Sequence, residues 1–80
     1  MTEVRIDEAL WENSMAPEGI LARWTAKDGA EVDLGAHVAD VLIEGARHKI
    51  MAPAAGRLRH EVDTHYVIEP GAVIGRITSV

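Results

Sequence analysis

Several residue types are missing from this chain of 80 residues, and each absence excludes a kind of site. There is no cysteine, which excludes disulfides, thiolate nucleophiles and zinc sites built on sulfur. There is no phenylalanine, so we expect an aliphatic core around Trp11, Trp24 and Tyr66. No apolar run approaches the roughly 20 residues of a transmembrane helix, and Met1–Arg5 lacks the basic start and apolar stretch of a signal peptide. We therefore expect one cytoplasmic domain over residues 1–80 with no membrane contact.

Basic residues are also few, and lysine is the scarcest. The chain has 8 basic and 13 acidic residues, a net charge of −5, and only Lys27 and Lys49 as lysines. A nucleic-acid binder would show a basic stripe, so this charge balance argues against nucleic acid as a partner.

Glycine and proline interrupt the chain every few residues, and the runs between them are short. Val and Ile are frequent in these runs. In several runs the side chains alternate between two faces, as where Leu58, His60 and Val62 alternate with charged residues. In the same way Ile20, Ala22 and Trp24 should share one face of a strand. Short alternating strands between turn residues predict an all-β sandwich or barrel. The segment from Glu8 to Met15 is predicted as a loop or a single helical turn.

The chain contains an internal repeat. The segment 35–41 aligns with 71–77, since both read Gly-Ala-x-β-x-x-β, where β is Val or Ile. Val32 and Ile68 precede them at the same spacing, and Gly19 and Gly56 at nearly the same spacing. This pattern predicts two similar β-units packed face to face about a pseudo-two-fold axis. The joining segment, 41–53, should form a hairpin at the end opposite the termini.

Five segments in order resemble one known family, the biotinyl/lipoyl attachment domains. The matching segments are Glu18–Trp24, Lys27–Gly35, Val38–Glu44, Ala52–Gly56 and Ile68–Gly75. These domains are the swinging-arm carriers of 2-oxo acid dehydrogenase complexes and biotin-dependent carboxylases. The resemblance implies a flattened β-barrel or sandwich of two four-stranded sheets with pseudo-two-fold symmetry, in agreement with the repeat.

The resemblance also implies a lysine at the tip of the central hairpin, where lipoate or biotin is attached in amide linkage. Counting forward from Glu44 places that position on Arg47, and counting backward from the Ala-Pro exit places it on Gly45. Neither residue is a lysine, and a guanidinium stays protonated and is a poor nucleophile. We predict a tight two-residue turn within Glu44-Gly45-Ala46-Arg47, centred on Gly45-Ala46, with positive φ at Gly45.

Lys49 is the only lysine near this turn. It follows Arg47 by two residues, so both side chains should share a strand face, roughly 6–7 Å apart along the strand. Lys27 lies in a loop and is given no carrier role. Arg47, His48 and Lys49 together give a basic hairpin on an acidic chain. This hairpin is either a solvated strand or a docking patch for an acidic partner.

Two hypotheses for function follow. The favoured one is a freestanding, non-enzymatic lipoyl-like domain without a cofactor that binds or scaffolds a protein partner. The alternative is an acyl carrier modified at Lys49 with lipoate, or less readily biotin, by a ligase, and serving a separately encoded 2-oxo acid dehydrogenase-type complex. A small enzyme or metal protein is disfavoured, because Ser14 and Ser79 lie in no nucleophile motif and the four histidines show no ligand spacing. We expect His37 and His65 in loops and His48 in the hairpin.

Overall fold

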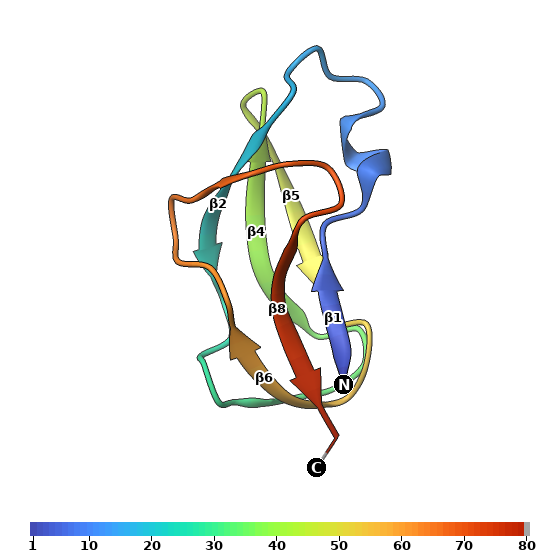
Figure 1. The fold of residues 1–80 in the computed structure, drawn as a ribbon, viewed down its shortest axis with the longest axis vertical. Helices are drawn as coiled ribbons and strands as arrows, with labels where there is room; N and C mark the ends of the chain where they lie inside the picture. The colour runs from blue at the N-terminus through green and yellow to red at the C-terminus, as the bar shows by residue number, and fades with distance from the viewer. Residues whose placement is uncertain (80) are drawn as a thin grey trace.

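The computed structural model describes residues 1–79 and shows an all-β architecture with one short helix (Figure 1). The elements in chain order are β1 (Thr2–Arg5), the 3-10 helix η1 (Glu8–Trp11), β2 (Gly19–Trp24), β3 (Glu31–Val32), β4 (His37–Ile43), β5 (Ala46–Met51), β6 (Gly56–His60), β7 (Val67–Ile68) and β8 (Val73–Thr78).

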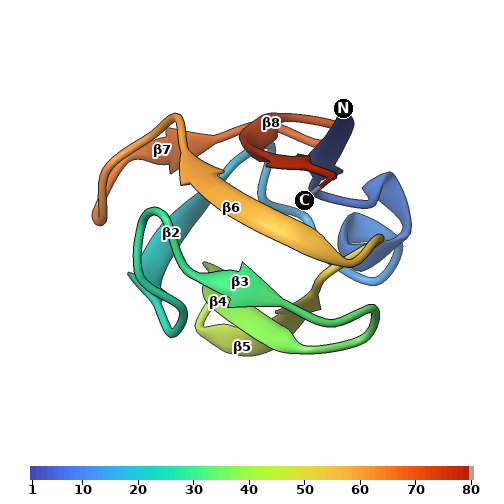
Figure 2. The same ribbon diagram turned by 90° about the horizontal axis from the view of Figure 1, so that it is seen from below.

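These strands form two antiparallel four-stranded sheets. The strand pattern predicted the all-β class, and the resemblance implied the two four-stranded sheets. One sheet has the order β1-β8-β6-β3 and the other β5-β4-β2-β7. Figure 2 shows β8 and β6 in one layer and β4 and β5 in the other. Exchanging β1–β4 for β5–β8 in turn converts the first order into the second. The two halves of the chain are therefore related as the pseudo-two-fold repeat requires.

Individual backbone hydrogen bonds and φ angles are also repeated in the two halves. Ile6 N donates to Ala72 O and Ala52 N donates to Ala36 O, both at 2.8 Å, and the two bonds occupy equivalent places in the two halves. Gly35 and Gly71, which open the repeated motif, have φ angles of 85° and 84°. Residues with a Cβ rarely adopt this conformation, which explains why each copy of the motif begins with glycine.

An aliphatic core fills the space between the sheets. Its largest fully buried side chains are Val4, Ile6, Leu21, Val38, Val41, Ile43, Leu58, Ile74 and Ile77. Trp11 is also buried, but the prediction that Tyr66 belongs to the core is wrong, because its side chain is 55% exposed. Tyr66 precedes the two-residue strand β7, which lies at the edge of its sheet and, within residues 1–79, pairs with β2 alone.

The prediction that Ile20, Ala22 and Trp24 share one face of a strand is wrong, because β2 contains a bulge. The pairing with β4 shifts between Leu21 and Arg23. As a result Leu21 is fully buried and Ile20 is 41% exposed, whereas Trp24, beyond the bulge, packs against the core. The extra residue of a bulge reverses which face the following side chains occupy, so simple period-two counting fails across it.

The Trp24 and His60 rings lie across the pseudo-two-fold axis from each other. Their centroids are 3.8 Å apart and their planes differ by 9°. Trp24 Nε1 donates to Val62 O at 3.0 Å, and His60 Nε2 donates to Ala26 O at 2.8 Å. The two rings stand 36 positions apart in the chain, and so do the two acceptors, Ala26 and Val62, as Gly35 and Gly71 do. The stacked rings therefore join the halves by two equivalent hydrogen bonds.

The segment between β1 and β2 contains the one helical turn that was predicted as an alternative to a loop. The Asp7 side chain accepts from Ala9 N at 2.9 Å and caps η1, which ends at the buried Trp11. No helix within residues 1–79 has the length and apolar character needed to cross a membrane.

Candidate functional site: the central hairpin

The β4–β5 hairpin closes in a two-residue turn made by Glu44 and Gly45. Their φ angles are 50° and 81°, and Ile43 and Ala46 on either side are direct ladder partners. Two consecutive positive φ angles are typical of the type I′ turn, which matches the twist of the flanking strands. The predicted centre on Gly45-Ala46 is therefore wrong by one residue. Ala46 and Arg47 belong to β5, because the ladder already begins at Ala46.

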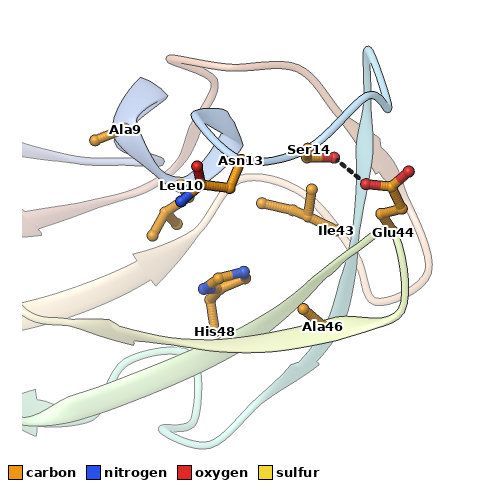
Figure 3. A pocket seen from close by; sticks show the side chains of 8 residues that line it. All are labelled: Ala9, Leu10, Asn13, Ser14, Ile43, Glu44, Ala46 and His48. Carbon is orange, nitrogen blue, oxygen red and sulfur yellow. Dashed lines mark hydrogen bonds between the residues drawn. The ribbon is translucent and has the colours of Figure 1, made fainter.

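The Glu44 carboxylate at this tip is bonded to the chain's own N-terminal segment (Figure 3). Its Oε2 accepts from Ser14 Oγ at 2.9 Å and from Met15 N at 3.1 Å. Ser14 Oγ also accepts from Ala16 N at 3.0 Å, which holds the segment in a turn over the hairpin. The tip of the hairpin therefore carries a carboxylate that already accepts two hydrogen bonds from the segment before β2. Sequence reasoning missed these contacts because the partners lie about 30 residues away and share no local motif.

Lys49 lies within β5 and away from the turn. It is exposed, and its direct partner across the ladder is Asp40 on β4. At about 3.3 Å per residue, its Cα is roughly 10 Å along the strand from Ala46, the first residue after the turn. Arg47 shares its outer face, as predicted. The structure therefore places the candidate attachment lysine on the flank of the hairpin.

A buried carboxylate gathers cations on the outer face of the same sheet. Asp40 is 1% exposed, and its Oδ2 accepts from Arg23 Nε at 2.8 Å and lies 3.5 Å from Arg47 Nη1. Its Oδ1 accepts from His37 Nε2 at 2.7 Å. The Arg23 hydrogen bond holds the pKa of Asp40 below its usual value, with help from His37, although burial acts in the opposite direction.

Sequence analysis did not identify this cluster. His37 was expected in a loop, but it is the first residue of β4, where its ring reaches Asp40. The remaining signal was an acidic residue inside an apolar run, since Asp40 lies between Val38-Ala39 and Val41-Leu42. A charge in such a position is stable only when paired, so a partner on a neighbouring strand could have been inferred.

His48 separates from the basic patch predicted for residues 47–49. Arg47 and Lys49 lie on the outer face of β5, whereas His48 is half-buried on the opposite face. There it lines a cavity of about 400 Å³ between the hairpin and η1, together with Ala9, Leu10, Ile43 and Ala46 (Figure 3). The basic patch of this sheet therefore consists of Arg23, Arg47 and Lys49.

Replacing Asp40 with asparagine tests the cluster through pH. Because the folded-state pKa is lowered, the carboxylate contributes stability above its unfolded pKa, about 3.9, and loses it as pH falls through the lower folded value. We expect Asp40→Asn to lower the free energy of unfolding by about 2 kcal/mol at pH 7. Urea unfolding from pH 7 down to pH 2 should show this difference shrinking below about pH 3.9. Asp33→Asn, at an exposed position, serves as the control, and an equal pH-dependent difference there would contradict the assignment.

Within residues 1–79, no group of three or more histidine, aspartate or glutamate side chains is placed to hold a metal ion. Comparison of the chain with protein-family models and with curated proteins finds no match.

Proposed function

We propose that this protein is a non-enzymatic binding or scaffolding module, an unmodified relative of the swinging-arm lipoyl and biotinyl carriers, which acts on a protein partner in the cytoplasm. The observation that carries the proposal is the hairpin tip. In the carriers this turn presents a lysine amine, whereas here Glu44 and Gly45 form the turn and the Glu44 carboxylate bonds to Ser14 and Met15.

The chemistry of attachment explains why this difference matters. Amide formation with an activated lipoate or biotin requires a free amine as the nucleophile. A carboxylate cannot act in this way, and Arg47, two residues after the turn, carries a guanidinium, which is a poor nucleophile, and lies beside Asp40. The resemblance to carriers therefore supports a shared scaffold with a different use of the hairpin.

A second candidate is a working carrier with lipoate, or less readily biotin, on Lys49. It is favoured by one observation: Lys49 is exposed and forms no ion pair with a carboxylate of residues 1–79. Against it stands the position of Lys49 on a regular strand. A ligase that reads the tip of a tight turn would have to reach the flank of β5 instead.

Intact mass separates the two candidates. The chain is co-expressed with a lipoate ligase, and separately with a biotin ligase, beside a carrier domain known to be modified under the same conditions. We expect no mass gain in the wild-type chain. A gain that disappears in Lys49→Ala would establish the carrier function and overturn the proposal.

A matched variant tests the role of the tip directly. Glu44→Lys places an amine in the turn, and it adds little backbone strain because Glu44 already adopts a φ of 50° as a residue with a Cβ. A mass gain in Glu44→Lys alone would identify the missing tip amine as the reason that the wild-type chain stays unmodified.

A further inference from the structure

β5 is an edge strand of its sheet. Within residues 1–79, β5 pairs with β4 alone and ends its sheet, and at six residues it is longer than the other edge strands, β1, β3 and β7. An edge strand presents a row of backbone donors and acceptors that a further extended chain can pair with.

The charges beside this edge are unbalanced. On the opposite sheet, Arg5, Arg57, Arg59 and Arg76 are all paired with carboxylates of that sheet or its adjoining loops. On the outer face next to β5, Arg23 and Arg47 share the single carboxylate of Asp40, and Lys49 has no ion pair among the described residues. Although the chain carries a net charge of −5, this face has an excess of positive charge.

The inner side of the same strand borders a cavity. Ala46 and His48 line it from β5, and Ala9 and Leu10 line it from η1, around about 400 Å³ (Figure 3). Side chains of a strand point alternately to its two faces. A strand added to β5 would therefore place every second side chain toward this cavity and the others beside Arg47 and Lys49.

We infer that the edge of β5 binds an extended acidic segment of a partner protein, in which acidic and apolar residues alternate, as an added strand. The acidic side chains pair with Arg47 and Lys49, and an apolar side chain enters the cavity beside His48. Backbone pairing supplies affinity, and the alternating pattern supplies specificity. This inference rests on the proposed function, because it names the partner that such a binding module takes.

The charges also argue against a second copy of the chain on this edge. Pairing β5 with β5 would bring Arg47 and Lys49 of one copy beside those of the other. Like charges placed opposite each other across a ladder are destabilising. The edge therefore selects an acidic chain over its own copy.

The test uses the whole chain and a peptide with blocked ends of sequence Glu-Val-Glu-Leu-Glu-Val-Glu. We expect this peptide to shift the backbone amide resonances of residues 46–51 in a saturable titration, and to bind more weakly as salt is raised. A peptide with lysine in place of each glutamate, and one with proline in place of each apolar residue, should cause no such shifts. The first reverses the charge, and the second removes the apolar side chains together with every second backbone donor.

Two protein variants localise the effect. Lys49→Gln is expected to raise the dissociation constant about fivefold, because it removes the cation that faces the acidic side chains without placing a second acid opposite Asp40. Lys27→Gln makes the same change at an exposed site in the loop between β2 and β3, and it should leave binding within about twofold. Both side chains are exposed, so neither change removes a core contact.

Several outcomes would overturn the inference: no shifts at millimolar peptide, shifts confined to other strands, equal effects of the two variants, or a dimer of the chain alone that protects the β5 amides. An intact mass of the same sample keeps the two proposals apart. If the chain is unmodified and the peptide causes no shifts in β5, the docking site alone is overturned. A chain modified at Lys49 whose β5 still binds peptide overturns the proposed function alone.

Discussion

Replacing Gly56 with alanine is expected to lower the free energy of unfolding by about 3 kcal/mol. Gly56 opens β6 with a φ of 152°, and a Cβ there would lie 2.3 Å from Thr78 O and 2.9 Å from Ile77 Cγ2. Both neighbours belong to β8, so neither can move without disturbing a central strand. Equilibrium urea unfolding of the two proteins measures the loss.

Gly29→Ala separates the close approach from the backbone conformation. Gly29 has a φ of 88°, but no atom lies within 4 Å of the place its Cβ would occupy. Only the conformational cost then applies, and we expect a loss of about 1 kcal/mol. If the two variants lost equal stability, the contact with β8 would not be the reason for glycine at position 56.

Trp24→Ala should lower the free energy of unfolding by a similar amount, about 3 kcal/mol, at the lower end of the range for tryptophan because the ring is only partly buried. The change removes the stack on His60 and the hydrogen bond from Nε1 to Val62 O. Both contacts join the two halves of the chain, so their loss weakens the interface on which the fold depends. Urea unfolding again measures the change.

Trp24→Phe is the matched variant for this site. It keeps an aromatic ring over His60 but removes the Nε1 donor and part of the packed ring, so we expect a loss of about 2 kcal/mol. A double-mutant cycle that combines Trp24→Ala with His60→Ala should give a coupling of about 1 kcal/mol for the stacked pair. A coupling near zero would show that the rings are only neighbours and do not stabilise each other.

Features that repeat in the chain were the most predictable from sequence. The motif at Gly35 and Gly71 marked β4 and β8, and Gly19 and Gly56 marked the starts of β2 and β6. These residues are read locally, because a turn needs positive φ or a strand needs alternating Val and Ile. The repeat then fixed how the two halves pack.

The missing tip lysine was also visible in the sequence, but the contacts that replace it were not. The bond from Ser14 to Glu44 and the cluster around Asp40 join residues on separate elements, and their formation depends on the finished fold. The turn was displaced by one residue because Glu44, which has a Cβ, adopts a conformation that sequence rules reserve mainly for glycine. That displacement changes which residue of β4 lies opposite each residue of β5: Arg47 pairs with Leu42 instead of Glu44.

The pairing of β1 with β8 has a consequence for how the protein is made. Thr2 pairs with Ile77, and within the described residues β1 has no other strand beside it. During synthesis, at about 5–20 residues per second, the first strand leaves the ribosome several seconds before the strand it requires. The sheet of β5, β4, β2 and β7 can close first, and β1 must wait, exposed, until β8 arrives.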